Sequence, residues 1–372
     1  MLCHYCFNKH KRMEEMDIIQ CLTELSLASG PSGRERGEDS VLDRAKAQLA
    51  SLTDSAGKPV FQSIYTDRFG NLIGCRPCGK PDAKRVVLDA HLDEVGLLIT
   101  GAEDGFLTFR SVGGVDPRML PDREITLLTD PPSFGLVAVL PPHVQKPEDA
   151  DKSIPLSDLR IDAGLTQEQA EKLVGTFAVP RGTVKRLQND VISAKAMDDR
   201  AGFITLLRCA ELLKDVSLDV DVYILGSSRE ETNGGGALVG AFALEPDCFV
   251  AVDVTHARTP DGPKEETFPA GSGAIIGIGP NIARWMSDRF IDKADENHIP
   301  WLPEVMTGHT GTNAWEVQTA REGIATAVLS LPLKYMHSPV EALDLRDLEA
   351  CASLLAEFVK DLAKEGGDFL AD

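Results

Sequence analysis

Two histidines and several carboxylates lie in five short segments of this chain, each near the end of an apolar run. The segments are His91-Leu92-Asp93, Asp198-Asp199, Glu230-Glu231, Asp253 and His337. Two divalent ions held about 3.5–4 Å apart need histidine and carboxylate ligands, one carboxylate being shared by both ions. Unrelated surface acids would explain any one segment, but five segments in the same kind of context favour a dinuclear metal site.

The apolar runs beside these residues predict the strands that would position them. They span residues 86–90 before His91, 221–226 before Glu230, 248–252 before Asp253 and 324–330 before His337. Near-continuous apolar runs bounded by turns are typical of strands buried on both faces of a parallel sheet. The carboxyl ends of such strands meet at one edge of the sheet, where ligands of α/β proteins gather.

Local spacing suggests separate roles for neighbouring acids. His91 and Asp93 stand two residues apart, so an extended backbone places both side chains on one side of the strand. His91 can then bind metal while Asp93 holds the other ring nitrogen and fixes the tautomer. A single histidine is more often a buried core residue than a ligand. Asp199 is interpreted as the cap of a helix that runs from Ala201, with no metal role.

Composition and charge narrow the class of protein. The 372 residues include 43% hydrophobic and 26% charged residues, which is typical of a globular chain of two domains. A net charge of −20 argues against nucleic acid and anionic membranes as partners. Eight scattered cysteines fit reduced thiols, and no apolar stretch reaches the length of a membrane span or a secretory signal. These features predict a cytoplasmic protein.

The periodicity of the chain changes twice. Helical patterns cover residues 17–27, 38–52, 201–213 and 345–363, whereas short strand-like runs begin after Val95, with a turn signal at Asp104-Gly105 and a capping box at residues 166–169. We therefore expect a catalytic α/β domain built from residues 1–95 and 187–372, with a small β-rich insert at residues 96–186. Residues 1–15 are interpreted as an extension.

The ordered motifs of the chain, taken together, resemble the M42 family of metallo-aminopeptidases, the tetrahedral and glutamyl aminopeptidase group. The resemblance covers nearly the whole chain, from about Ile18 to the C-terminal helix. Its marks include Gly30-Pro-Ser-Gly33, Asp67-Arg-Phe-Gly-Asn71, Asp89-Ala-His-Leu-Asp-Glu-Val-Gly96, Ala196-Met-Asp-Asp-Arg-Ala-Gly202, Arg229-Glu-Glu-Thr232, Val252-Asp-Val-Thr-His256 and Tyr335-Met-His337.

The resemblance implies a fold: a three-layer αβα metallopeptidase domain with an inserted β-barrel-like domain used for assembly, most often into a dodecamer. It also implies two divalent ions, zinc or cobalt. The first ion would be held by His91, Asp198 and Asp253, and the second by Asp198, Glu231 and His337. A metal-activated hydroxide would cleave the N-terminal residue from a short peptide, with Glu230 as general base.

Two other functions stay open at this point. The same metal core could serve a related dinuclear amidohydrolase that acts on another amide, such as an N-acyl amino acid. A non-catalytic assembly protein that retains the fold is the third possibility, although an intact ligand set disfavours it. One residue departs from the family pattern: Asn313 stands where an aspartate is usual, close to His309. A changed substrate preference or rate is one expectation from that departure.

Overall fold

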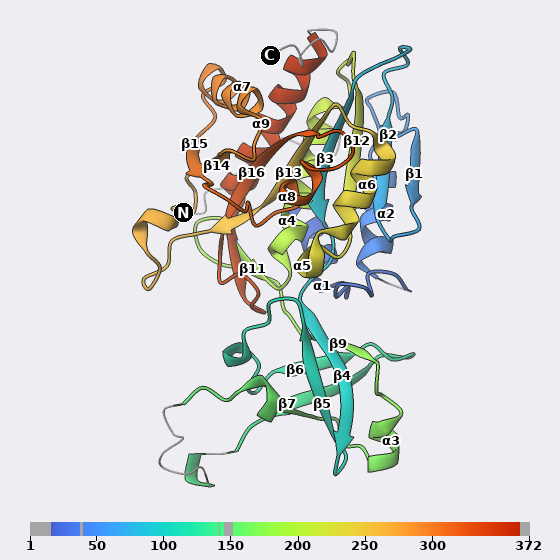
Figure 1. Cartoon of the computed structure of the whole chain (residues 1–372), viewed down its shortest axis with the longest axis vertical. Helices are drawn as coiled ribbons and strands as arrows, with labels where there is room; N and C mark the ends of the chain where they lie inside the picture. Colours follow the sequence, from blue (N-terminus) through green and yellow to red (C-terminus); the bar gives the residue numbers. More distant parts are fainter. Residues whose placement is uncertain (1–15, 38–39, 141, 145–151, 365–372) are drawn as a thin grey trace, which may run out of the picture.

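The fold is elongated, with a large sheet and its helices at one end and a small barrel at the other (Figure 1). A computed structural model describes residues 16–37, 40–140, 142–144 and 152–364. The proposed extension at residues 1–15, and Cys3 and Cys6 within it, lie outside the described residues. Among the described residues, no helix combines the length and apolar character needed to cross a membrane.

The first three helices begin where a side chain accepts a hydrogen bond from an N–H group of the first turn. Asp17 caps α1 and Ser40 caps α2, while Thr166 and Gln169 form the predicted capping box of α3. Asp199 accepts a hydrogen bond from the Gly202 N–H, as expected of a capping residue. The helices are α1 Ile18–Leu27, α2 Val41–Ser51, α3 Gln167–Glu171, α4 Met197–Leu213, α5 Glu230–Asn233, α6 Gly235–Leu244, α7 Arg284–Glu296, α8 Ala314–Val317 and α9 Leu345–Lys364.

The large sheet has 11 strands, of which nine follow the order β1-β2-β12-β3-β13-β16-β17-β11-β10, with β14 and β15 attached beside β16. Its central strands β12, β3, β13 and β16 pair in parallel. The strands of this sheet are β1 Ser63–Thr66, β2 Leu72–Arg76, β3 Arg85–His91, β10 Lys185–Arg186, β11 Val191–Ala194, β12 Asp221–Ser227, β13 Cys248–His256, β14 Ala274–Ile278, β15 Trp301–Val305, β16 Ala325–Lys334 and β17 Glu341–Asp344.

Helices cover both faces of this sheet, which gives three layers. Along β13, Val250 and Val252 pack into one core with α4 and α9, whereas Phe249 and Ala251 pack into a second core with α6 and α8. Successive strand residues thus face opposite cores, which explains why these strands read as continuous apolar runs. The predicted αβα architecture is confirmed.

The second part of the molecule is a closed barrel in the order β4-β5-β8-β7-β6-β9. Asp104 and Gly105 both have positive φ in the two-residue turn between β4 and β5, as the turn signal predicted. After the barrel the chain re-enters the large sheet at β10, which pairs with β11. The barrel strands are β4 Gly96–Glu103, β5 Phe106–Val112, β6 Glu124–Leu127, β7 Ser133–Ala138, β8 Arg160–Asp162 and β9 Phe177–Pro180.

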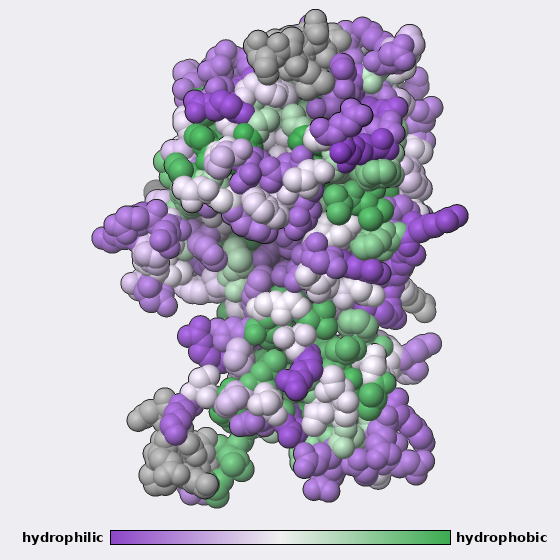
Figure 2. All heavy atoms as spheres, viewed as in Figure 1, coloured by the Kyte–Doolittle hydropathy of each residue, from purple (hydrophilic) through white to green (hydrophobic). Residues whose placement is uncertain are grey.

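Apolar side chains on the barrel surface distinguish the outer face of β7. Val137 points into the barrel core, while Phe134 and Leu136 alternate with it and are 56% and 53% exposed. Apolar residues gather on this part of the molecule and also over α6 (Figure 2), where Phe242 is another exposed aromatic residue. Contiguous exposed apolar patches often mark surfaces that contact another molecule.

Candidate metal centre

All the predicted ligands converge at the carboxyl edge of the parallel strands. His91 is the last residue of β3, while Glu230 and His337 follow the ends of β12 and β16 by three residues. Asp253 lies inside β13 rather than after it, because that strand continues to His256. Asp198 comes from the first turn of α4, where its backbone is not helical, so its side chain can turn toward the strand ends.

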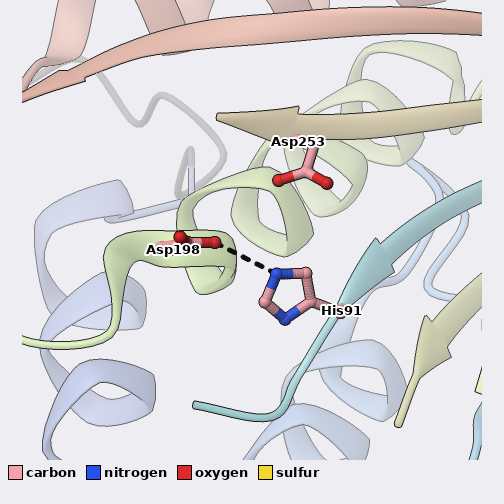
Figure 3. Close-up of side chains that lie close together, drawn as sticks. All are labelled: His91, Asp198 and Asp253. Carbon is pink, nitrogen blue, oxygen red and sulfur yellow. Dashed lines mark hydrogen bonds and ion pairs between the residues drawn. The ribbon is translucent and has the colours of Figure 1, made fainter. Parts of the chain in front are cut away.

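Two groups of three ligand atoms share the Asp198 carboxylate. One atom from each of His91, Asp198 and Asp253 lies within 4.8 Å of the others, and the same holds for Asp198, Glu231 and His337. In the first group the His91 Nε2 is 3.0 Å from Asp198 Oδ1 (Figure 3). In the second group the His337 Nε2 is 3.2 Å from Asp198 Oδ2 and 3.2 Å from Glu231 Oε2. One carboxylate therefore faces both histidines, each through a different oxygen.

The contacts of the other ring nitrogens test whether this donor set suits cations. His337 Nδ1 lies 2.9 Å from the carbonyl oxygen of Gly114, and His91 Nδ1 lies 3.2 Å from the carbonyl oxygen of Asp93. A carbonyl only accepts, so each Nδ1 donates a proton and each Nε2 is left facing a carboxylate. Two facing acceptors need a cation or a proton between them. Both groups therefore fit divalent ions with histidine and carboxylate ligands.

The negative charge of the site also favours bound cations. Burial raises the pKa of Asp253 and Glu231, and burial with the nearby acids raises the pKa of Glu230 to about 8. Burial opposes protonation of His337, but its contacts with Asp198 and Glu231 outweigh burial and raise its pKa to about 11. In the described part of the chain, Asp198, Glu230 and Glu231 form ion pairs with His91 or His337 but with no lysine or arginine. Bound cations would supply the missing positive charge.

Asp93 orients the neighbouring glutamates as well as His91. Its carboxylate Oδ1 lies 3.6 Å from His91 Nδ1, farther than the backbone oxygen of the same residue. The carboxylate also accepts hydrogen bonds from the Ser32 hydroxyl and from the N–H groups of Glu230, at 3.0 Å, and Glu231, at 3.2 Å. Asp93 thus caps the short helix α5, and it fixes the turn on which two predicted site residues stand.

Sequence reasoning missed Glu341, which holds two ligand segments from behind. Its Oε2 accepts hydrogen bonds from the N–H groups of Met197, at 2.6 Å, and Asp198, at 3.2 Å, and its Oε1 accepts one from His337, at 2.8 Å. Glu341 is 2% exposed, and burial raises its pKa. The available signal was a glutamate at the start of a short apolar run just after His337.

Asn313, the residue that departs from the family pattern, lies beneath the site. Its side-chain amide donates to Asp89 Oδ2 at 2.7 Å and to the Ser227 hydroxyl at 2.9 Å, and the residue is 2% exposed. Burial raises the pKa of Asp89, its partner, to about 7. Asn313 therefore braces the ends of β3 and β12. The ring of His309 lies 4.5 Å from that of Trp315, and its Nδ1 accepts from the Gly311 N–H within its own loop.

A cleft of about 260 Å³ opens beside both ligand groups. Its walls come from the ends of β13 and β15 and from the loops that precede α8 and follow β16. Besides ligands, the lining includes Val254, Thr255, Glu304, Met306, Thr310 and Met336. A substrate that occupies this cleft would lie directly against Glu230 and Asp253.

The αβα layers, the inserted barrel and the paired ligand groups define a metal-dependent hydrolase of the peptidase class. Residues 70–354 match the family model described as M42 glutamyl aminopeptidase, and the chain belongs to that family. The predicted resemblance is thereby confirmed.

Known relatives cover most of the chain. It is 32% identical to a lysyl aminopeptidase of Pyrococcus furiosus over 82% of this chain and 89% of that protein. An aminopeptidase from Desulfurococcus kamchatkensis matches with a TM-score of 0.84 and 32% identity, over 95% of this chain and 98% of that one. Pyrococcus horikoshii TET1 peptidase, which assembles into a tetrahedron or an octahedral shell, matches with a TM-score of 0.79 and 29% identity, over 93% and 100%.

The role of Glu341 can be tested against a matched buried acid. Glu341→Gln replaces one acceptor oxygen with an amide that faces an N–H group, so Asp198 or His337 should lose its support. We expect metal affinity to fall by about 10–100-fold, the usual effect of losing a group that orients ligands. Isothermal titration calorimetry with zinc measures the metal affinity of each variant.

Asp347→Asn is the control, because Asp347 is also buried and accepts two backbone N–H bonds, from Gly271 and Gly273, without touching a ligand. That variant should lose stability but keep its metal affinity. If both variants bind zinc as tightly as the wild-type protein does, Glu341 stabilises the fold but does not position the metal ligands.

Proposed function

We propose that this chain is a two-metal aminopeptidase that removes N-terminal residues from short peptides. The observation that carries the proposal is the Asp198 carboxylate, which faces His91 with one oxygen and His337 with the other. With Asp253 and Glu231 it completes two ligand groups of three. Two divalent ions, zinc or cobalt given the mixed ligands, would polarise the scissile carbonyl and lower the pKa of a water molecule.

Glu230 is the proposed general base. It is adjacent to a ligand, but its carboxylate lies 4.0 Å from His91 Nε2, outside hydrogen-bond distance, and its side chain is 18% exposed in the cleft. Burial raises its pKa to about 8 in the metal-free chain. Bound cations beside it would favour the ionised form, which can take a proton from water and return it to the leaving amine. The hydrogen bond from its own N–H to Asp93 holds the residue at the cleft wall.

The substrate's free amine gives the proposal its most direct test. Acids around the ligand groups would hold a positively charged α-amine, whereas a dinuclear amidohydrolase for N-acyl amino acids would take the acylated form. We expect the metal-loaded protein to cleave a free-amine aminoacyl anilide and leave its N-acetylated form intact, with activity lost on chelation and restored by zinc or cobalt. The reverse preference would favour the amidohydrolase. A purified protein that binds no metal and cleaves neither would favour a non-catalytic assembly role.

Substitutions of the two adjacent glutamates test which one is the base and which one is a metal ligand. Glu230→Gln keeps the size of the side chain and removes the base, so both metals should stay bound while kcat falls by about 10²–10⁴-fold. Glu231→Gln removes an anionic ligand, so the second ion should bind more weakly and excess metal should restore part of the activity. Metal content measured beside turnover distinguishes the two. Loss of metal from the Glu230 variant, with retention in the Glu231 variant, would reverse the assignment.

We also propose that residues 96–186 form an assembly domain, that the chain forms a homo-oligomer such as a dodecamer, and that it acts in the cytoplasm. The closed barrel, its exposed residues Phe134 and Leu136 and the shell-forming relative support the assembly proposal. The described cysteines form no disulfide, and this and the net charge of −20 fit the cytoplasm.

Assembly through the barrel predicts a mass change from one surface substitution. Leu136→Lys places a charge in the proposed contact, so light scattering should report a smaller species than the wild-type oligomer at micromolar concentration. Leu27→Lys is the control, because Leu27 is similarly exposed, at 48%, but lies at the end of α1. A monomeric wild-type protein, or an unchanged mass for the Leu136 variant, would contradict the proposal.

A further inference from the structure

Besides the proposed base Glu230, one further carboxylate in the cleft belongs to neither ligand group. Glu304 stands on β15 and lines the cleft beside Thr255 and Met306. Its Oε1 accepts a hydrogen bond from the Thr255 hydroxyl at 2.7 Å. Its Oε2 is buried and has no hydrogen-bond partner. An acceptor in this state costs free energy unless a ligand satisfies it, and burial correspondingly raises the pKa of the Glu304 side chain.

The position of Glu304 separates it from the reacting atoms. Asp253 and Thr255 stand two residues apart on β13, so their side chains share one face and are displaced by about 6.6 Å along the strand. Glu304 is one hydrogen bond beyond Thr255. A substrate whose amine and scissile carbonyl lie at Asp253 could not bring those atoms to Glu304. The end of a long first side chain could reach it.

The rest of the cleft suits the stem of such a side chain. Met306 and Met336 supply apolar surface, against which a lysine or arginine stem can pack while its charged end reaches a polar group. The residues that line the cleft include histidines but no lysine or arginine. An acidic first side chain would therefore meet Glu304 without a strong cation beside it, and an apolar one would leave Oε2 unsatisfied.

From this geometry, and resting on the proposed aminopeptidase function, we infer that Glu304 selects substrates with a cationic first side chain, lysine or arginine. Its free oxygen would accept a hydrogen bond from the substrate ammonium or guanidinium group. Thr255 acts as a positioning residue, since its hydroxyl donates to the opposite oxygen and restrains the carboxylate. Glu304 touches the substrate, but no atom that reacts.

Two isosteric substrates test the inference. The anilides of lysine and norleucine have the same four-carbon stem and differ at its end only by the ammonium group. The metal-loaded wild-type protein should favour lysine in kcat/KM by about 10–100-fold, the range for a hydrogen bond between charged groups that excludes water. Glu304→Gln retains an oxygen for Thr255 and removes the charge, so the ratio should collapse toward one, mainly through KM for the lysine substrate.

The control is Glu322→Gln, which removes one negative charge from the same domain at an exposed position outside the cleft. It should leave the lysine preference unchanged. The Glu304 variant should retain wild-type metal content and norleucine turnover, which shows that its fold is intact. Charge reversal by Glu304→Lys should shift preference toward a glutamate anilide.

Three results would overturn the inference. A wild-type protein that cleaves norleucine as well as lysine, or a lysine preference that survives in Glu304→Gln, would exclude Glu304 as the selecting group while leaving the aminopeptidase proposal standing. Absence of cleavage of every free-amine anilide by the metal-loaded protein would overturn the proposed function, and this inference with it. The two failures are therefore distinguishable.

Discussion

The compensation of buried negative charge is the constraint on which the rest of this structure depends. The chain brings many acids to one edge of a sheet, and it offsets their charge in three ways. Glu94 pairs with Lys195 and Arg200, whose positive charges lower its pKa despite complete burial. Asp93 and Glu341 are satisfied by backbone N–H groups. Among the described residues, Asp198, Glu230 and Glu231 pair with histidines but with no lysine or arginine, so divalent ions are the natural complement of this part of the site.

The pairing of Glu94 with Lys195 and Arg200 links the site to the rest of the fold. Arg200 lies two residues after Asp198 and is fully buried, and its guanidinium donates to the carbonyl oxygens of Leu25 and Ala28 as well as to Glu94. Lys195, three residues before Asp198, pairs with the same glutamate. The segment that carries Asp198 is therefore held by Glu94 on both sides, and Arg200 also ties it to the N-terminal helix α1. Truncating either cation would leave Glu94 buried with incomplete pairing, which is far more costly than losing a surface ion pair.

Sequence could predict that the candidate ligands lie together because most of them stand beside a strand whose apolar pattern is local. The carboxyl ends of parallel strands share an edge, so His91, Glu231 and His337 were expected to meet there. Glu341 escaped prediction because its partners, Met197 and Asp198, are more than 140 residues away and are bound through backbone groups that carry no side-chain signal. Asn313 was visible as a departure, yet its burial against Asp89 depends on how α8 packs on the sheet. The lone oxygen of Glu304 likewise depends on β15 lying beside the end of β13, a tertiary contact that no local pattern reports.

Backbone conformation shows why the capping acids matter to the ligands. Ala196, Arg229 and His337 have positive φ of 54°, 60° and 62°, and each lies within two residues of a ligand or is one. Left-handed conformations cost non-glycine residues about 1–3 kcal/mol each and persist only where surrounding contacts impose them. Here the N–H groups in or just after these turns bind Glu341 or Asp93, so two buried carboxylates hold three strained turns. The turns are what allow Asp198, Glu231 and His337 to leave their helices and strands and face one another. The geometry of the candidate ligands is thus set by the fold itself, through two acids that lie outside both ligand groups.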